Sequence, residues 1–221
     1  GAMVGPEAFT EVRYLAHAKQ LQALDLLPEL AVEFQQVFGR NSGGLIKPYH
    51  LEDAETVVIA LGSVLGTIKD TVDEMRAQGV KIGVLGITSF RPFPIEAIRA
   101  VTAHAKRIVV IEKCFAVGIG GIVSRDVRSA VQSRPQQVFA VVAGLGGRAI
   151  TKASLHKLLL QAIEDKLELL TFLDLDWGIV NRVLEREKQQ RRSGPVAEGI
   201  LRDIGTVSRE APAAALNRSE R

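Results

Sequence analysis

The chain has 221 residues, of which 47% are hydrophobic and 24% charged, so it is long enough for one sizeable core with additions. Its net charge of +3 comes from interspersed basic and acidic residues, which excludes the basic face of a nucleic-acid-binding protein. A single cysteine, Cys114, excludes an internal disulfide and an iron–sulfur cluster held by this chain, and it favours a reducing, cytoplasmic location. No apolar stretch approaches the roughly 20 residues that a membrane span needs, so no membrane partner is expected.

The first residues predict a short leader followed by a helix. Gly1-Ala2-Met3 resembles the scar that a protease leaves when a tag is removed, so we assign residues 1–5 to a leader and expect an excised fragment, with a separate subunit as the alternative. Residues 6–44 are a helical linker in which Pro28 predicts a break or kink and Gly39 an end. Its apolar residues follow two stripes at helical spacing: Phe9, Val12 and Ala16, then Leu24, Leu27, Ala31, Phe34 and Phe38.

The middle region, residues 45–150, alternates strand and helix patterns. Short aliphatic runs without alternation predict strands covered on both faces at 57–61, 81–87, 107–111 and 138–143. Helical patterns lie between them at 67–78, 94–105 and 121–131, which is enough chain for crossover connections. We therefore expect an α/β fold, a three-layer α/β/α sandwich with a mostly parallel five-stranded sheet. The fifth strand is an antiparallel edge strand at 45–49, because Pro48 is tolerated only at an edge.

Residues 151–221 predict a helical C-terminal extension with a loose tail. Thr151 is placed to cap a helix with apolar residues at 155, 158, 159, 162 and 163, and Asp176 to cap another that begins at Trp177. Beyond Gly194-Pro195 the composition turns to Ala, Pro, Arg, Ser and Glu, which predicts that about the last ten residues lack fixed structure.

A glycine turn follows the first parallel strand and is the first candidate binding site. Ligands of open parallel sheets bind beyond the carboxyl ends of the strands, and a helix that starts there directs free N–H groups at anions. The turn comprises Gly62, Ser63, Gly66 and Thr67. Its glycine spacing differs from the dinucleotide-binding pattern, and no acidic residue follows at the next strand end to bind a ribose. Tight strand–helix packing is the simpler interpretation, and an anion site is the alternative.

Arg91, between Phe90 and Pro92, is the second candidate. Pro92 restricts Arg91 to an extended conformation, and Pro94 suits the first position of a helix, so the guanidinium is held at a fixed angle. We expect it within reach of the Gly62–Thr67 turn, where it could bind a carboxylate or phosphate. The favoured alternative is a salt bridge to a neighbouring helix or subunit.

Glu112 ends the third parallel strand and precedes the glycines Gly118, Gly120 and Gly121. It could act as a general base, but no partner stands at a telling spacing, which favours a role in holding the glycine loop or pairing with a cation. Cys114, without a nearby His or second Cys, is typical of a small buried hydrophobic residue, and a reactive thiolate is the alternative. After the next strand, residues 144–147 predict a sharp turn that places Arg148 near the rim.

Catalytic and metal-ligating patterns are missing from the sequence. The four histidines are scattered over separate predicted elements, and no pair has ligand spacing. No nucleophile elbow or Ser-His-Asp arrangement appears. The sequence therefore predicts neither a catalytic residue nor a metal site.

Several segments resemble the alpha subunit of pyruvate:ferredoxin oxidoreductases and related 2-oxoacid:acceptor oxidoreductases, in its transketolase C-terminal-like domain. The resemblance extends over about residues 6–205 and is strongest at 57–94, 116–123 and 143–152, with further similarity at 10–14, 172–177 and 192–195. It implies a strand order in which 81–87 lies on one side of 57–61 and 107–111 on the other. The 138–143 strand then lies outward, and 45–49 lies at the far edge beside 81–87.

The resemblance also implies a function for the whole enzyme. Members decarboxylate a 2-oxoacid oxidatively to acyl-CoA with thiamine diphosphate, Mg²⁺, iron–sulfur clusters and coenzyme A, and pass electrons to ferredoxin or flavodoxin. This chain has neither the Mg-diphosphate motif nor a cysteine set, so no catalytic residue or cofactor is carried over to it. We expect a non-catalytic domain that packs against other subunits and supports a dimer, with an open apolar face along residues 9–38 or on the C-terminal helices. The alternative is an autonomous module that binds phosphate, coenzyme A or a nucleotide in a pocket lined by Gly62, Ser63, Arg91 and Gly120.

Overall fold

The computed structural model of the protein describes residues 3–132, 134–190, 199–201 and 204–205. The expectations for the tag scar at residues 1–2, for the 192–195 motif and for the C-terminal tail fall outside these residues. Among the described residues, every helix is too short or too polar to span a bilayer.

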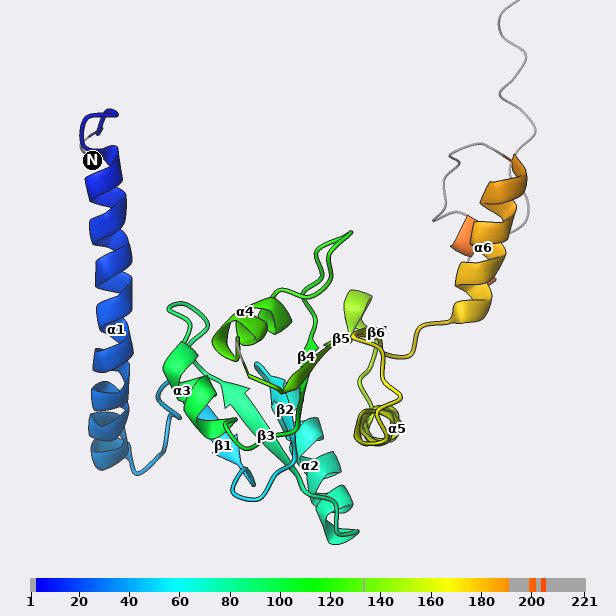
Figure 1. Cartoon of the computed structure of the whole chain (residues 1–221), viewed down its shortest axis with the longest axis horizontal. Coiled ribbons are helices and arrows are strands. Elements are labelled where there is room, and N and C mark those ends of the chain that lie inside the picture. Colours follow the sequence, from blue (N-terminus) through cyan, green and yellow to red (C-terminus); the bar gives the residue numbers. More distant parts are fainter. Residues whose placement is uncertain (1–2, 133, 191–198, 202–203, 206–221) are drawn as a thin grey trace, which may run out of the picture. The chain divides into compact units, whose positions relative to one another are not determined.

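A six-stranded sheet forms the centre of the fold (Figure 1). Its strands lie in the order β1-β3-β2-β4-β5-β6, with β1 antiparallel to β3 and every other neighbouring pair parallel. The predicted order of the first five strands is confirmed, including Pro48 on an edge strand. The strand bounds are β1 Ile46–Tyr49, β2 Thr56–Ala60, β3 Ile82–Ile87, β4 Arg107–Glu112, β5 Gln137–Val142 and β6 Leu170–Phe172.

The sixth strand corrects the prediction of five strands. β6 has three residues, too few for a periodic pattern, and its own sequence gives no strand signal. It pairs in parallel with β5, and the backbone N–H groups of Ala140 and Leu173 donate to the carbonyls of Leu169 and Val142 at 2.9 Å.

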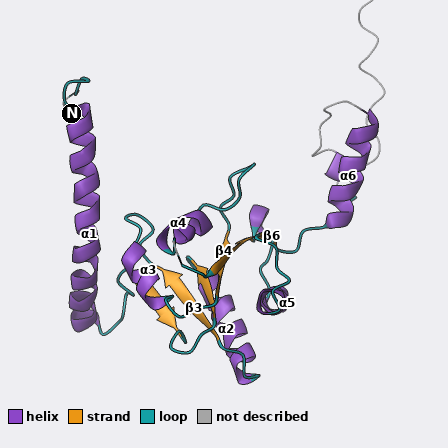
Figure 2. Cartoon of the chain, in the orientation of Figure 1, coloured by secondary structure: helices purple, strands orange, loops and turns teal. Residues whose placement is uncertain are grey.

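Helices cover both faces of the sheet, as the three-layer prediction requires (Figure 2). On one face, α2 (Val64–Ala77) and α5 (Lys152–Ile163) pack against alternate strand residues such as Val58 and Val109. On the other, α3 (Ile95–Val101) and α4 (Val123–Ala130) pack against the residues between them, such as Ile59 and Val110. β2 and β3 are buried along their whole length, which accounts for their uninterrupted apolar sequences.

The packed core continues beyond residue 150. α5 contributes Leu155, Leu158 and Leu159 to the core, and the Thr151 hydroxyl caps the helix as predicted by accepting a hydrogen bond from the Ser154 N–H at 3.1 Å. The boundary placed at residue 150 from the sequence therefore falls inside this core. The chain divides into two compact units after Leu173.

Two further helices, α1 and α6, come before and after the sheet-forming segment in the sequence. α1 (Phe9–Phe38) runs without interruption through Pro28, so the predicted break does not occur, and none of its side chains is buried. Gly39 ends it in a left-handed conformation (φ 66°) with its N–H donating to the Gln35 carbonyl. In the second unit, α6 (Trp177–Gln190) has the predicted cap, because Asp176 Oδ1 accepts from the Ile179 N–H at 3.0 Å.

Candidate functional site

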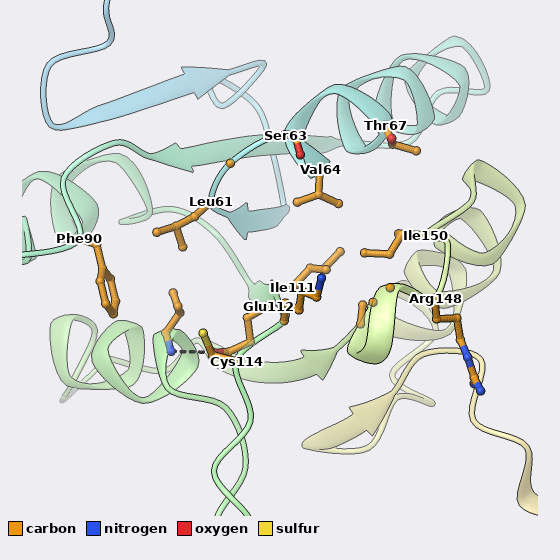
Figure 3. Close-up of a pocket in the computed structure, with 16 residues that line it drawn as sticks. Leu61, Ser63, Val64, Thr67, Phe90, Ile111, Glu112, Cys114, Arg148 and Ile150 are labelled. Atoms are coloured by element: carbon orange, nitrogen blue, oxygen red, sulfur yellow. Dashed lines mark hydrogen bonds between the residues drawn. The ribbon is translucent and has the colours of Figure 1, made fainter. Parts of the chain in front are cut away.

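A cavity of about 590 Å³ opens where β2, β4 and β5 end. The chain leaves β2 for β3 on one side, and β4 lies on the other, so the cavity occupies the switch point at which parallel sheets bind ligands. Figure 3 shows Leu61, Val64, Ile111 and Ile150 around this space. These side chains, with Phe90 and Val123, make the walls mainly apolar.

The glycine turn after β2 forms one wall of the cavity. Gly62 has φ of 78° and a side chain there would meet no atom, so the glycine serves a left-handed turn next to open space. α2 begins at Val64, three residues before the predicted start at Thr67, so Gly66 lies within its first turn and not in the preceding loop. Gly62, Ser63 and Thr67 line the cavity.

The first turn of α2 is less open to an anion than the sequence indicated. The Leu65 N–H donates to the Gly62 carbonyl at 3.3 Å, and the Gly66 N–H donates to the Ser63 carbonyl at 3.1 Å. Two of the N–H groups on which the anion hypothesis depends therefore already have protein partners. A ligand at this turn stays a prediction.

Glu112 is a buried carboxylate at the end of β4, and it holds the start of α4. Its Oε2 accepts from the N–H groups of Ile122 and Val123 at 2.7 Å, and its Oε1 accepts from Ser124 N–H at 2.9 Å. A carboxylate has about four lone-pair sites, so at most about one is left for another donor. This arrangement agrees with the favoured interpretation, in which Glu112 holds the glycine loop.

Gly121 and Gly120 have different reasons for being glycine. A side chain on Gly121 would overlap with the Glu112 carboxylate and the Ser124 hydroxyl. Gly120 has φ of 107° and closes a small loop through reciprocal backbone bonds of 2.9 Å with Ala116. Neither glycine lines the cavity.

Arg91 forms an ion pair with another residue of the same chain. Its Nη2 donates to Asp126 Oδ2 on α4 at 2.8 Å, and its guanidinium carbon lies 4.1 Å from the centre of the Phe90 ring. Among the described residues, those lining the cavity include Phe90 but not Arg91. The predicted approach to the Gly62–Thr67 turn is thus not what the geometry favours, whereas the predicted salt bridge to a neighbouring helix is present.

Other polar residues reach the cavity from β4 and from the loop after β5. Lys113 and Cys114 follow Glu112, and Gly144, Gly147 and Arg148 come from the predicted sharp turn. The prediction that Cys114 is buried is wrong: it is exposed, because the chain has left the buried strand β4 at Glu112. In Figure 3 the guanidinium of Arg148 points away from Val64 and Ile111. Among the described residues, no cluster of three or more His, Cys, Asp or Glu side chains could hold a metal ion.

The cavity therefore joins Gly62, Ser63, Thr67 and Glu112, but not Gly66, Arg91, Gly120 or Gly121. The four-residue pocket expected for an autonomous binding module does not form as a unit. The apolar walls were not foreseen, because Leu61 and Ile111 occur in strand sequences and Ile150 follows a loop. A sequence signal does exist for such residues: Leu61 and Ile111 end the aliphatic runs that predict two strands, and Ile150 follows Gly147 of the glycine turn by three residues.

A protein family and several known proteins are similar to this chain. Residues 54–155 match the family described as pyruvate:ferredoxin oxidoreductase core domain II. Pyruvate synthase subunit PorA from Methanosarcina barkeri is 41% identical over 162 residues, which cover 72% of this chain and 40% of that protein. Ketoisovalerate oxidoreductase subunit VorA from Pyrococcus horikoshii is 33% identical over 154 residues, 68% of this chain and 39% of that protein.

A solved structure is also similar. A chain of 2-oxoglutarate:ferredoxin oxidoreductase from Magnetococcus marinus has a TM-score of 0.43 and 18% identity, over 62% of this chain and 21% of that chain. The chain spans about 40% of the length of the curated relatives that it matches.

Proposed function

Since this chain belongs, through residues 54–155, to the pyruvate:ferredoxin oxidoreductase family as its core domain II, we propose that it is a non-catalytic assembly domain of a 2-oxoacid oxidoreductase. In this proposal the complete enzyme decarboxylates a 2-oxoacid oxidatively and transfers the acyl group to coenzyme A. The relatives are named for pyruvate, at 31–41% identity, and for ketoisovalerate, at 33%, and we take pyruvate as the expected 2-oxoacid because most of the matched relatives are pyruvate synthase subunits.

The hydrogen bonds that Glu112 accepts are the observation that supports a non-catalytic role. A general base needs an oxygen free to accept a proton from a substrate. Among the described residues, Glu112 is the one acidic residue that lines the cavity, and three backbone donors already occupy its carboxylate. The lining that the structure describes contains no His either. The described residues at this edge therefore hold the start of a helix and form a mainly apolar surface, which supports a non-catalytic role.

The cofactors of the reaction belong, in this proposal, to other parts of the enzyme. Thiamine diphosphate with Mg²⁺ supplies the carbanion chemistry, and iron–sulfur clusters supply the electron path to ferredoxin or flavodoxin. One cysteine cannot hold a cluster, since each cluster needs about four protein ligands. The same single cysteine supports a cytoplasmic location.

Assembly with other subunits is supported by the exposed side chains of α1. Eleven large apolar residues of this helix are exposed: Phe9, Val12, Tyr14, Leu15, Leu21, Leu26, Leu30, Val32, Phe34, Val37 and Phe38. An exposed apolar surface of this kind marks an interaction site in a stable protein. These side chains lie on several sides of α1, so the helix offers the exposed apolar surface, though not the single face, that was expected of an assembly domain.

Cofactor binding tests the proposal. The purified chain is incubated with thiamine diphosphate and Mg²⁺, and binding is measured by calorimetry alongside pyruvate decarboxylation. We expect neither binding nor turnover. Stoichiometric thiamine diphosphate on the purified chain, or turnover that follows the chain through successive purification steps, would contradict the non-catalytic role.

A further inference from the structure

The loop between β4 and α4, residues 113–122, extends away from the sheet and exposes apolar side chains at its tip (Figure 1). Val117 is 89% exposed and Ile119 is 58% exposed. Below the tip, Ala116 and Gly120 exchange two backbone hydrogen bonds of 2.9 Å, which hold the two sides of the loop together. The loop therefore presents two β-branched side chains to the solvent on a backbone of defined shape.

The same loop forms part of the rim of the apolar cavity. Lys113 at its start lines the cavity, and so does Val123, which follows its last residue. Another part of the rim comes from the loop after β5, where Leu145 is 44% exposed between the lining residues Gly144 and Gly147. The cavity and the exposed apolar side chains of these two loops thus share the carboxyl edge of the sheet.

The extent of this surface favours a polypeptide over a small ligand. A small molecule between walls such as Leu61 and Ile111 would leave Val117 exposed, because Val117 does not line the cavity. A polypeptide segment can place one apolar side chain in the cavity and cover the loop with its neighbours. One side chain held in a pocket, with weaker contacts around it, is the usual centre of a protein interface.

The charges at the rim select the chemistry of the partner. Lys113 and Arg125, in the first turn of α4, are exposed, and neither forms an ion pair with another residue that the structure describes. The carboxylates next to them in the sequence are already engaged. Asp126 pairs with Arg91 at 2.8 Å, and Glu112 accepts three backbone hydrogen bonds. A complementary partner therefore carries carboxylates.

We propose that this carboxyl-edge surface, from the cavity to the tip of the 113–122 loop, binds an acidic segment of another oxidoreductase subunit. The segment places one apolar side chain in the cavity and its carboxylates beside Lys113 and Arg125. This inference deepens the proposed assembly role and rests on it. It assigns a subunit contact to the edge at which parallel sheets commonly bind small ligands.

Photo-crosslinking tests the contact. Val117 is replaced by p-benzoylphenylalanine in the full chain, which is tagged, kept at its native expression level and irradiated in the complex that co-purifies with it. The control carries the same group in place of Gln78, an exposed residue before β3 at the amino edge of the sheet. We expect position 117 to crosslink to a segment of another oxidoreductase subunit that contains Asp or Glu beside an apolar residue. Position 78 should not crosslink to that segment.

Charge reversal tests the chemistry of the partner. Lys113→Glu/Arg125→Glu should lower the amount of oxidoreductase subunits recovered with the chain at least about tenfold, because it opposes carboxylates to carboxylates. The matched control, Lys47→Glu/Lys157→Glu, makes the same change of charge at exposed residues of β1 and α5 and should leave recovery unchanged. Both variants should melt like the unaltered chain, which separates a lost contact from a lost fold.

The outcomes distinguish this surface from the assembly role. A complex that is recovered intact without a crosslink at position 117 would overturn the surface and leave the assembly role standing. A crosslink to a second copy of this chain, or to a segment without Asp or Glu, would do the same, as would unchanged recovery of Lys113→Glu/Arg125→Glu. Recovery of the chain without any oxidoreductase subunit would contradict the assembly role itself, and this inference with it.

Discussion

The carboxylate of Glu112 occupies the space that a side chain on Gly121 would need. The two residues come from different elements, since Glu112 ends β4 and Gly121 precedes α4. Their contact lets one carboxylate reach three successive N–H groups at the start of α4. An acid that sequence alone leaves open as a catalytic base is thereby committed to holding a loop.

Substitution of Gly121 tests this contact. Gly121→Ala should lower the free energy of unfolding by about 1–3 kcal/mol, because the new methyl group overlaps with Glu112 and Ser124. Gly66→Ala is the control, since it lies within α2 and its side chain would meet no atom. The control should be neutral or stabilising by up to about 1 kcal/mol. Urea denaturation of both variants measures the difference. Equal urea midpoints for Gly121→Ala and Gly66→Ala would contradict the steric account.

Removing the charge of Glu112 tests its role as a cap. Glu112→Gln keeps the shape but turns an amide group toward backbone donors, so at least one N–H loses its acceptor. We expect a loss of about 1–3 kcal/mol in the free energy of unfolding, measured by chemical denaturation. Glu52→Gln, at an exposed position, should change it little. A Glu112→Gln protein as stable as the unaltered chain would show that the cap bonds contribute nothing.

The Arg91–Asp126 pair should contribute little to stability, because both side chains are partly exposed. A double-mutant cycle with Arg91→Ala and Asp126→Ala should give a coupling energy of about 0.2–1 kcal/mol. The same Arg91→Ala protein should bind phosphate and coenzyme A no differently from the unaltered chain. A tenfold loss of ligand affinity in Arg91→Ala would instead make Arg91 part of an anion site.

A surface carboxylate provides a pH test. The hydrogen bond from Lys106 Nζ to Glu55, at 2.7 Å, lowers the pKa of Glu55 below its ordinary value of 4.5. A pKa lowered by folding means that the contribution of Glu55 to stability is present above pH 4.5 and is lost as the pH falls through the lowered pKa. Lys106→Met should raise the pKa of Glu55 toward 4.5 in an NMR titration. An unchanged midpoint would show that Lys106 is not its cause.

The sequence predicts the sheet well because its strands are buried on both faces. β2 and β3 are continuous aliphatic runs, so their positions and those of their crossover helices can be predicted from the sequence. The position of β6 cannot be predicted in this way, because three residues carry no periodicity and the strand is defined by its pairing with β5. Pro28 shows a different limit: it costs the helix a hydrogen bond, yet α1 continues on both sides of it.

The candidate site is predicted less well than the fold. The strand ends that carry Gly62 and Glu112 are fixed by the sheet, and both residues reach the cavity. The direction of Arg91 depends on Asp126, which is 35 residues further along the chain, and a local pattern contains no information on that partner. The use of Glu112 as a cap likewise depends on how the loop before α4 folds back over β4.

Co-purification tests the assembly role most directly. The chain is tagged at its native expression level, isolated without overproduction, and its partners are quantified by mass spectrometry together with thiamine diphosphate and iron. We predict recovery in fixed stoichiometry with subunits that carry thiamine diphosphate and iron–sulfur clusters, and 2-oxoacid-dependent reduction of ferredoxin by that complex. Recovery of the chain without such subunits, or 2-oxoacid oxidation by the chain alone, would contradict the account.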